Sequence, residues 1–559
     1  MPKSYYVSGQ GNDNNTGLSS NSPFRTLQKA ADLTQPGDTV YVMNGTYTYA
    51  DPFDSVLNIR NSGTANAWIT YRAYPGHAPK LKSNNWNAIE VQGAAYIVID
   101  GLKLEGNNDN IKLGYALSQK NNLGNPATSG NGIGIRPSRQ GPRKNPHHII
   151  IRNNEISKFG GAGLYTNSAD YVTIEGNRVY NNAWYSPYGS SGISVGGWNS
   201  DSSTGYKIII RGNSVYGNQQ LVPWYKVGQI TDGNGIIVDT GRNSDNGVPG
   251  GAYTGRTLIE NNVVSSNGGR GIHVYKSDHV DIINNTAFQN SQHPDIRDGE
   301  ITVVEASDVR VLNNIMYAKT GRPANIVSNA TKIVYDYNLV FNSTTFTSLG
   351  NNNIVGQDPL FVNALIGDFS LQSGSPALDK AGGLTTAKDR YGINRPQGNG
   401  VDIGAIERPM GGSPSLTTVK QGTGGTDSLT GTAQNDRLSG LEGDDRLIGL
   451  DGNDLLQGGS GNDLLSGGNG NDRLIGNGGK DQLIGGAGRD IFVLKRRDGR
   501  DVIQDFRDGL DKIDLVGDLR FSNLTVRPQG RNTLLQVGQT DLVLILNTRP
   551  NQFTTADFI

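Results

Sequence analysis

The chain of 559 residues has no cysteine, no marked excess of one charge and no long apolar run. The lack of cysteine excludes disulfides and thiolate chemistry, although it does not settle the compartment. Lys and Arg number 50 against 51 Asp and Glu, so the overall charge favours neither nucleic acid nor an anionic membrane surface as a partner. No stretch approaches the roughly 18 apolar residues of a membrane span. The opening MPKSYYVSGQ lacks the apolar segment of a cleaved signal, so we expect no N-terminal secretion signal.

Glycine, by contrast, is abundant, and a nine-residue repeat near the C-terminus uses much of it. An aspartate recurs every nine residues, and an apolar residue follows two places later in each repeat. Glycine permits tight turns, the apolar residue fills a narrow core, and carboxylate and carbonyl oxygens are the ligands that Ca²⁺ prefers. The predicted metal ligands are Asp427, Asp436, Asp445, Asp454, Asp463, Asp472, Asp481 and Asp490, and the predicted core residues are Leu438, Leu447, Leu456, Leu465, Leu474 and Leu483.

The charge of this segment supports a calcium-binding role. Residues 424–491 contain 11 acidic and five basic residues, a local balance of −6 that stacked coils would concentrate. The motif resembles the RTX nonapeptide repeat, which implies a parallel β-roll that binds Ca²⁺. Residues 495–559 resemble the tail of RTX proteins that are exported by a C-terminal (type I) signal. This resemblance implies an extracellular protein whose folding is completed by calcium after export. A plain glycine-rich linker is the alternative, but linkers do not keep an aspartate at a constant spacing.

A second repeat runs through the first four hundred residues as alternating strands, each closed by an asparagine. The closing residues recur about every 23 positions, with longer intervals at 178–212 and 214–261, and a second series of short strands lies between them. Several short strands per coil with period-2 alternation predict a parallel β-helix, in which the asparagines stack as an internal ladder. The ladder residues are Asn154, Asn177, Asn213, Asn262, Asn285, Asn314 and Asn338.

Both ends of this solenoid are predicted to be covered. Ser22 and Pro23 precede FRTLQKAADL, the one convincing helix, with Ser22 as the cap and Pro23 in the first turn. This entry segment resembles that of secreted β-helix polysaccharide enzymes, including the family-nine pectate lyases, and residues 358–407 resemble the closing segment of extracellular β-helix proteins. The fold expected is all-β, a right-handed parallel β-helix followed by the RTX roll. The expected domains are a β-helix at 1–410, a linker at 411–423, the roll at 424–494 and a β-rich tail at 495–559.

The two long intervals carry most of the aromatic residues that could serve a binding site. Aromatic rings presented from loops suit the apolar faces of sugar rings, although they could instead pack onto the barrel. A basic stretch, RPSRQGPRK, could hold an anionic chain or simply face solvent. The candidate substrate-binding residues are Trp184, Tyr185, Tyr188, Trp198, Trp224, Tyr225, Arg136 and Arg242.

Strand alternation then assigns polar side chains to one outer face of the helix. Ile236, Val238, Ile272 and Val274 are predicted to point inward, so Asp239, His273 and Tyr275 should point outward. Lys276 follows in the chain, while neighbouring coils supply further groups. The candidate catalytic residues are Lys276, His273, Tyr275, Arg270, Asp239 and Glu300, with Asp232 as a candidate metal ligand.

Two mechanisms compete for this face. In β-elimination on a uronate, a cation or arginine neutralises the C6 carboxylate and an unprotonated Lys, His or Tyr removes the C5 proton. Asp232 and Asp239 could hold a Ca²⁺ there, and the pectate lyase resemblance implies a lysine base, for which Lys276 is the candidate. Hydrolysis would instead use the pair Asp239 and Glu300. The preferred hypothesis is a secreted, monomeric polysaccharide lyase; a glycoside hydrolase and a non-catalytic glycan-binding adhesin are the alternatives.

Overall fold

The computed structural model of the protein describes most of the chain as two compact units. One unit comprises residues 1–371 and 375–408, and the other comprises residues 372–374 and 409–559. Among the described residues, no helix is both long and apolar enough to cross a bilayer. The described residues are 2–75, 77–239, 241, 251–364, 367–408, 418–496, 498–515 and 519–558.

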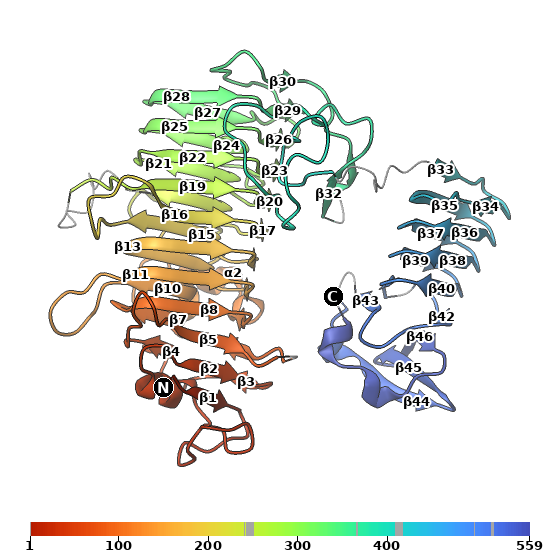
Figure 1. Cartoon of the computed structure of the whole chain (residues 1–559), viewed down its shortest axis with the longest axis horizontal. Helices are drawn as coiled ribbons and strands as arrows, with labels where there is room; N and C mark the ends of the chain where they lie inside the picture. The colour runs from red at the N-terminus through yellow and green to blue at the C-terminus, as the bar shows by residue number, and fades with distance from the viewer. Residues whose placement is uncertain are drawn as a thin grey trace. The chain divides into compact units, whose positions relative to one another are not determined.

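The first unit is a parallel β-helix, in which successive coils stack as the ribbon in Figure 1 shows. A full coil adds one strand to each of three sheets, which we call sheets 1, 2 and 3 in chain order. Sheet 1 contains β4 (Ser55–Ile59), β7 (Asn87–Gln92), β10 (Asn131–Arg136), the first half of β13 (Leu164–Glu175), β15 (Ile193–Gly197), β18 (Ile236–Asp239), β21 (Ile272–Tyr275), β24 (Ile301–Val304) and β27 (Asn325–Ser328).

Sheets 2 and 3 complete each coil. Sheet 2 contains β1 (Ser4–Val7), β2 (Thr39–Val42), β5 (Ile69–Ala73), β8 (Ala95–Asp100), β11 (His147–Arg152), the second half of β13, β16 (Tyr206–Arg211), β19 (Arg256–Glu260), β22 (Val280–Ile283), β25 (Ser307–Leu312) and β28 (Thr331–Asp336). Sheet 3 contains β3 (Thr46–Tyr47), β6 (Lys80–Lys82), β9 (Lys103–Glu105), β12 (Glu155–Ser157), β14 (Arg178–Tyr180), β17 (Ser214–Tyr216), β20 (Val263–Ser265), β23 (Thr286–Phe288), β26 (Ile315–Tyr317), β29 (Leu339–Phe341) and β30 (Ile354–Val355).

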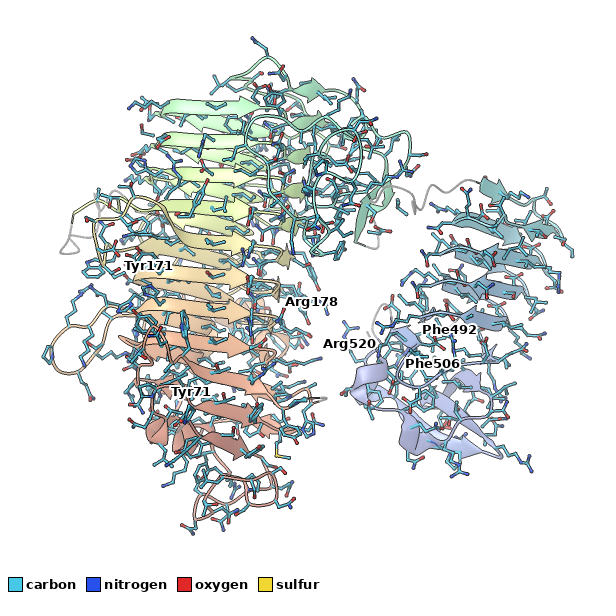
Figure 2. The ribbon with its side chains drawn as sticks, viewed as in Figure 1. Tyr71, Tyr171, Arg178, Phe492, Phe506 and Arg520 are labelled. Carbon is cyan, nitrogen blue, oxygen red and sulfur yellow. The ribbon has the colours of Figure 1, made fainter. Side chains whose placement is uncertain are left out.

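The interior of the β-helix is filled by one apolar side chain from every second strand position. Ile236, Val238, Ile272 and Val274 all belong to this core, which confirms the predicted alternation in β18 and β21. Larger side chains also fill the interior near the first coils, where Tyr71 is fully buried (Figure 2). This continuous core holds the outward-facing residues of sheet 1 at a fixed register.

The predicted asparagine ladder is confirmed along the turn between sheets 2 and 3. In each coil the backbone N–H and the Nδ2 of one asparagine donate to Oδ1 of the next, as Asn213 does to Asn262 at 2.9 Å for both bonds. The ladder runs from Asn154 through Asn338 and continues to Asn353. Because the rungs from Asn154 to Asn338 are buried and satisfied, the ladder ties the coils together along the helix axis.

A second ladder, which the sequence analysis missed, lies at the turn between sheets 3 and 1. Asn182, Asn218, Asn267 and Asn290 repeat the same geometry five residues after an asparagine of the first ladder. The recurring pattern of two asparagines separated by four residues was the sequence signal for it. The two ladders together fix both ends of the sheet 3 strands β14, β17, β20 and β23.

The helices differ in part from the prediction. The entry helix α1 (Leu27–Leu33) begins later than expected, because Thr26 rather than Ser22 is its N-cap and accepts a hydrogen bond from Lys29 N. Phe24 instead bridges to Val7 and is buried. Two short helices lie in one coil insertion, α2 (Leu113–Ser118) and α3 (Pro126–Ser129). The described 3₁₀ turns are η1 (Asn108–Asn110), η3 (Phe521–Asn523), η4 (Pro550–Gln552) and η5 (Thr555–Asp557).

The segment after the last full coil folds back over sheet 3. It contains the antiparallel pair β31 (Phe361–Asn363) and β32 (Asp368–Leu371). Phe369 and Ile403 pack with Phe288 and Ile315 in an apolar cluster outside the main core. The part of sheet 3 that contains Phe288 and Ile315 is therefore covered by this closing segment.

The second unit begins with a β-roll whose strands alternate between two parallel sheets. One sheet contains β33 (Thr418–Gln421), β35 (Asp436–Glu442), β37 (Leu455–Ser460), β39 (Arg473–Gly478), β41 (Ile491–Leu494) and β43 (Lys512–Leu515). The other contains β34 (Ser428–Thr430), β36 (Arg446–Asp451), β38 (Leu464–Asn469), β40 (Gln482–Ala487), β42 (Asp501–Ile503) and β46 (Thr540–Ile545). Beyond β46 this sheet continues in antiparallel pairing with β45 (Asn532–Val537) and β44 (Thr525–Gln529). The six predicted core leucines are all fully buried, as the nine-residue period required.

Candidate functional site

The outer wall of sheet 1 carries a row of side chains whose order follows from the strand register. Glu90 pairs with Gly134, Gly134 with Tyr165, Tyr165 with Ser194, Ser194 with Ile237 and Ile237 with His273. The coils stack at about 4.8 Å, so Gly134 and His273 lie roughly 19 Å apart along this wall. Two groups of polar residues occur on the wall, one around Arg136 and one around His273.

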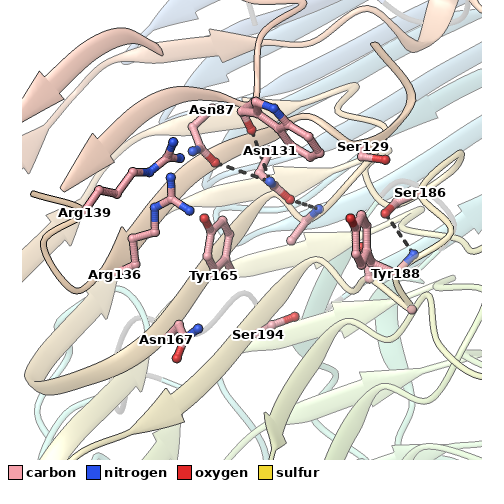
Figure 3. Close-up of a pocket in the computed structure, with 14 residues that line it drawn as sticks. Asn87, Ser129, Asn131, Arg136, Arg139, Tyr165, Asn167, Ser186, Tyr188 and Ser194 are labelled. Carbon is pink, nitrogen blue, oxygen red and sulfur yellow. Dashed lines mark hydrogen bonds between the residues drawn. The ribbon is translucent and has the colours of Figure 1, made fainter. Parts of the chain in front are cut away.

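The first group surrounds a pocket of about 590 Å³, which we call the sheet 1 pocket. It lies on β7, β10, β13 and β15 and is bordered by the coil insertion around Tyr188. Figure 3 shows the guanidinium of Arg136 between Arg139 and Tyr165. The residues that line the pocket are Trp86, Asn87, Ser129, Asn131, Arg136, Arg139, Ala162, Tyr165, Asn167, Ser186, Tyr188, Gly189, Ser190 and Ser194.

One buried carboxylate holds two arginines at the wall of this pocket. Glu90 is almost fully buried and forms ion pairs with Arg136 and Arg139, the latter at 3.0 Å. Its other oxygen accepts a hydrogen bond from Gln92 Nε2 at 2.9 Å. Within the described part of the chain, Arg136 Nη2 has no hydrogen-bond partner. Two guanidinium charges against one carboxylate leave an excess of one positive charge facing the pocket, which suits an anionic ligand.

Tyr165 occupies the same pocket because a glycine lies opposite it in the row. A Cβ on Gly134 would lie 2.8 Å from the Tyr165 ring, so the ring rests where any other residue would collide with it. Burial raises the pKa of the Tyr165 phenol, while the charge of Arg136 acts in the opposite direction. A phenol thus lies beside the guanidinium pair and can exchange a proton with a bound ligand.

The aromatic residues predicted to bind substrate divide into two kinds. Tyr188 and Tyr225 are exposed by 40% and 41% and meet edge to face at 5.7 Å between ring centroids. Trp184 and Tyr185 pack instead with Val222, which supports the packing alternative for this pair. Only Tyr188 of the four lines the sheet 1 pocket. The flat faces available to a sugar are therefore those of the exposed tyrosines.

The two remaining tryptophans lie elsewhere. The ammonium of Lys226 lies over the ring of Trp224, 5.5 Å from the ring centroid. Trp198 lines a separate pocket of about 660 Å³ together with Tyr96, Arg143 and His147. Arg242, another predicted substrate-binding residue, lies outside the described residues.

The second polar group, around His273, contains several of the predicted catalytic residues. His273 and Tyr275 stack at 5.8 Å, and the imidazole shares a 2.6 Å hydrogen bond with Thr302. Lys276 Nζ lies 5.1 Å from the Tyr275 ring centroid and 3.9 Å from Glu305. Burial, with a smaller effect of Arg270, lowers the pKa of His273 well below its usual value. His273 is therefore neutral near pH 7 and largely covered.

Arg270, also in this group, is already engaged. Its Nη2 forms an ion pair with Asp298 and its Nη1 donates to the Thr231 carbonyl at 2.5 Å. The excess positive charge that marks the sheet 1 pocket is thus lacking around Arg270.

Glu300 does not join the outer wall, and its predicted orientation is wrong. Its carboxylate is fully buried and accepts hydrogen bonds from Asn290 N at 2.9 Å and Asn290 Nδ2 at 2.5 Å. It thereby ends the second asparagine ladder. Burial raises the pKa of Glu300 to about 8. The expectation failed because Glu300 occupies the position of a glycine in earlier coils, before the strand begins, where the chain still turns.

The proposed calcium site between Asp232 and Asp239 is also not supported by the geometry. Asp232 lies in the loop before β18, where its oxygens accept hydrogen bonds from Thr231 Oγ1 at 2.7 Å and Asn234 Nδ2 at 2.9 Å. Asp239 is the last residue of that strand. Four extended residues span about 10 Å, whereas Ca²⁺ ligands lie about 2.3 to 2.6 Å from the ion. Asp232 and Asp239 thus lie on different parts of this coil, and a Ca²⁺ site between them stays a prediction.

The roll, in contrast, presents carboxylates that fit calcium. From Asp445 to Asp490, each repeat aspartate uses Oδ1 to accept the backbone N–H of the aspartate 18 residues earlier, as Asp463 does from Asp445 at 2.8 Å. Within the described residues, five of the other oxygens are buried without a hydrogen-bond partner. Such atoms are costly unless a cation satisfies them. The five residues are Asp445, Asp454, Asp463, Asp472 and Asp481.

Glycine carbonyls complete the donor set around these carboxylates. A Cβ on Gly440 would lie 2.1 Å from Asp445 Oδ2 and 2.6 Å from the Gly458 carbonyl oxygen, so the glycine keeps this space open. Carboxylate and carbonyl oxygens are hard ligands of the type that Ca²⁺ takes. Burial accordingly raises the pKa of Asp454 and Asp472 to about 7. These residues would hold Ca²⁺, whose charge would keep them ionised.

Sequence reasoning missed Glu90, Tyr165 and Asn131 as site residues. Glu90 and Arg136 are 46 positions apart, and only coil stacking brings them together. The signal available was the strand NAIEVQ, in which a carboxylate occupies an outward position beside inward Ile and Val.

The architecture defines a class of protein, a parallel β-helix with a calcium-binding roll, and comparisons with known proteins identify the family. The model of the Pel9A-like right-handed β-helix region matches residues 5–298, more than half of the chain, so the chain belongs to this family. This membership supports a carbohydrate-active function. The model of the RTX calcium-binding nonapeptide repeat matches residues 421–456 and 457–492.

Solved structures with similar folds include two lyases and a hydrolase. Pectate lyase Pel9A is 15% identical, with 73% of this chain and 97% of that chain covered and a TM-score of 0.43. An alginate lyase from Paenibacillus sp. str. FPU-7 is 18% identical, with coverage of 59% and 95% and a TM-score of 0.35. The GH136 lacto-N-biosidase from Eubacterium ramulus is 14% identical, with coverage of 81% and 64% and a TM-score of 0.38. No curated protein matches the chain.

Proposed function

We propose that the protein is a secreted polysaccharide lyase that binds a uronate-containing polysaccharide along sheet 1 and cleaves it by β-elimination. The observation that carries this proposal is the pairing of Arg136 and Arg139 with one buried carboxylate, Glu90, at the wall of a pocket of about 590 Å³. The unbalanced positive charge selects an anionic sugar. The exposed ring of Tyr188 at the pocket offers a face for stacking.

The chemistry follows from what a uronate places in this pocket. Its C6 carboxylate pairs with the two guanidiniums, which disperses the negative charge and makes the C5 proton more acidic. Ionised Tyr165 accepts this proton, the C4–O4 bond breaks with its electrons leaving on O4, and a C4–C5 double bond forms. Tyr165 then returns the proton to the departing O4, so no net proton is consumed. The phenol and the guanidiniums act on the same sugar because they line the same pocket.

The geometry favours elimination over hydrolysis. The hydrolase alternative required Asp239 and Glu300 as an exposed pair of carboxylates, but Glu300 is fully buried at the end of a ladder. In the sheet 1 pocket, Glu90 is engaged by Arg136 and Arg139. Assignment of Lys276 as the base, with His273, Tyr275, Arg270 and Asp239 around it, stays a prediction for a second position on the same wall.

The experiment is an assay for the unsaturated uronate, which absorbs ultraviolet light. Wild-type protein is incubated with pectate, alginate and glycosaminoglycans, and Tyr165→Phe, Arg136→Gln and Lys276→Met variants are compared. Tyr165→Phe should lower kcat at least a hundredfold without loss of binding, whereas Lys276→Met should stay within threefold of wild type. Loss of activity in Lys276→Met alone would move the reaction centre to β21. New reducing ends without the chromophore would contradict elimination.

Secretion through a C-terminal signal is part of the same proposal. Two observations support it: the family model of RTX repeats covers the roll, and the buried unpaired carboxylates fit Ca²⁺, which is more abundant outside cells. Fusing residues 424–559 to a passenger protein in a host with a type I exporter tests this. Retention of the fusion inside the cells would contradict it.

A further inference from the structure

A second pocket, which we call the sheet 3 pocket, lies where the closing segment meets sheet 3. Its volume is about 480 Å³, and it is lined by Arg178, Tyr216, Ser265, Phe288, Arg390 and Tyr391, among others. It belongs to a different sheet of the β-helix from the sheet 1 pocket. Figure 2 labels Arg178, which marks its position on the helix.

The pocket exists because one small residue interrupts a row of aromatic residues. Across sheet 3, register places Tyr180, Tyr216, Ser265, Phe288, Tyr317 and Phe341 in successive coils. Tyr180 and Tyr216 stack at 5.0 Å with their planes within 4°. At Ser265 the row is open, so two coil spacings, about 10 Å, separate Tyr216 from Phe288. This gap accommodates one flat ring in contact with an aromatic group on each side.

Arg390 supplies a guanidinium at the pocket that forms no ion pair within the described residues. Its Nη2 donates to Ser214 Oγ at 2.7 Å and its guanidinium lies 5.3 Å from the Tyr391 ring centroid. Within the described residues, its Nε has no hydrogen-bond partner and no carboxylate lies close enough for an ion pair. Arg136, Arg211 and Arg270 of the same β-helix each have such a carboxylate. A guanidinium removed from water without a counter-charge is costly, which indicates that an anionic ligand satisfies it.

A second arginine, Arg178, lies on the Tyr216 side of the gap, on the strand before the one whose Ser214 binds Arg390. Arg178 Nη2 donates to Tyr216 Oη at 3.0 Å, which fixes the tyrosine ring against Tyr180. Its distance from Glu155 is 4.0 Å, at the limit of an ion pair. The hydroxyl of Ser265 lines the floor between the rings. The pocket therefore combines stacking surfaces, a hydroxyl and positive charge around the space for one ring.

We propose that the sheet 3 pocket is a second, non-catalytic glycan-binding site, which holds one carboxylate-bearing sugar between Tyr216 and Phe288 with its carboxylate at Arg390. The proposal rests on the proposed function only for the ligand class, a uronate-containing polysaccharide. Such a site would keep the enzyme on a polymer while the sheet 1 pocket acts on another part of it, which raises the effective substrate concentration.

The test is isothermal titration of the full chain in constant calcium with tetragalacturonate and with an alginate tetramer. Arg136→Gln is used as the background, so that binding in the sheet 1 pocket is weakened. One remaining acidic site is expected, and Ser265→Phe, which completes the aromatic row, should weaken it at least tenfold. Arg390→Gln should do the same and serves if Ser265→Phe fails to fold. Arg25→Gln, at an exposed position of the same unit, is the matched control.

Several outcomes would overturn this proposal. These are the absence of binding by both acidic tetramers in the Arg136→Gln background, an affinity within twofold of it after Ser265→Phe, or equal binding of neutral xylotetraose. Failure of the proposed function looks different, because wild-type protein would then yield no unsaturated product while binding at the sheet 3 pocket persisted.

A separate observation concerns the end of the calcium-binding roll. In five coils the outer oxygen of the repeat aspartate has no partner among the described residues, but Asp490 is an exception. Its Oδ2 lies 3.2 Å from Arg507 Nη2, which also contacts the Gly488 carbonyl at 2.6 Å and Asp511 Oδ1 at 3.2 Å. This donor set, a glycine carbonyl and two aspartates, is the kind that the inner coils offer to a metal ion.

We infer that the guanidinium of Arg507 is a built-in cation that takes the place of the last Ca²⁺ in its row of aspartates. The corresponding carboxylate in the other row, Asp481, which precedes Asp501, keeps an Oδ2 without a hydrogen-bond partner within the described chain. The last position of this row therefore needs no metal ion, because Arg507 occupies it. This end of the roll can order before calcium binds. The other row depends on calcium to its end.

Calcium stoichiometry measured by equilibrium dialysis and metal analysis tests this inference. Arg507→Gln should bind one more Ca²⁺ per chain than wild type at saturation and should need several-fold more calcium at the midpoint of folding, followed by circular dichroism. Arg507→Lys keeps the charge and should keep the wild-type stoichiometry, while Arg500→Gln is a control outside the aspartate rows. An unchanged stoichiometry in Arg507→Gln would overturn the inference.

Discussion

Glu300 ends a ladder of asparagines by accepting both the backbone N–H and the side-chain amide of Asn290. A carboxyl group thus replaces the amide that every earlier rung of this ladder uses. Because the site is fully buried, the pKa of Glu300 is raised to about 8. A residue first considered for catalysis is instead a pH-sensitive part of the scaffold.

Replacement of Glu300 by glutamine should remove a pH dependence of stability. In the folded state Glu300 keeps its proton up to about pH 8, whereas in the unfolded chain it loses it near pH 4.5. Wild-type stability should therefore fall as pH rises through this window. Glu300→Gln cannot ionise and should gain on the order of 4 kcal/mol relative to wild type between pH 5 and pH 9. Urea unfolding at both pH values measures this.

The exposed Asp295, near Glu300 in the chain, provides the control for that measurement. Asp295→Asn should show the same pH dependence as wild type. A Glu300→Gln variant whose stability parallels wild type at both pH values would contradict the assignment.

Removal of either arginine from the sheet 1 pocket should weaken binding of an acidic polysaccharide. A charge-assisted hydrogen bond contributes about 1.5 to 3 kcal/mol, so Arg139→Gln should raise Kd by about 10- to 150-fold. The effect should shrink at high salt, because part of it is electrostatic. Arg152→Gln, which removes an arginine paired with Asp100 on sheet 2, should leave Kd unchanged. Affinity electrophoresis in gels containing pectate or alginate can compare the three proteins.

The rate of cleavage should rise with pH in the alkaline range. The proposed proton acceptor is ionised Tyr165, whose pKa is raised by burial, so the reactive form grows as pH increases. We expect kcat/KM to increase from about pH 7 to about pH 10. Loss of this slope in Tyr165→Phe, with only residual activity left, would support the role. A bell-shaped profile centred near neutral pH in wild type would count against it.

Calcium removal should unfold the roll and leave the β-helix intact. Without Ca²⁺, five buried carboxylates have no compensating partner within the described residues, whereas the β-helix core is formed by apolar side chains and asparagine ladders. Chelation should therefore remove one of two thermal transitions in calorimetry. Asp463→Asn should raise the calcium needed to restore it, while Asp508→Asn, at an exposed position, should not. Loss of both transitions on chelation would contradict independent folding.

The parts of the fold that repeat were predictable, because the length of a sequence repeat indicates the geometry of one coil. Nine-residue spacing of Asp463 and Asp472, each with a leucine two places later, required stacked coils with one buried residue per turn. The spacing of Asn262 and Asn285 likewise predicted a ladder that the hydrogen bonds confirm. Helix α1 was predicted, but its cap was misplaced because two residues before it, Ser22 and Thr26, are both good caps.

The sites were less predictable than the scaffold. Glu90 and Arg136 are paired only because two coils stack in register, and insertions of variable length between coils conceal that register in the sequence. Tyr165 reaches the pocket because Gly134 leaves space for its ring. The orientation of Glu300 depended on where the turn ended and the strand began. A shift of one residue in that boundary exchanges inward and outward positions.

By itself the amino-acid sequence determined that this chain winds into an apolar-cored solenoid and a calcium-binding roll, since both follow from short periods that each coil repeats. Only the tertiary structure decided which polar residues become neighbours. Coil stacking brings side chains from distant positions onto one wall, where burial and charge then select the pair of arginines at Glu90 for an anionic ligand and turn Glu300 into the end of a ladder.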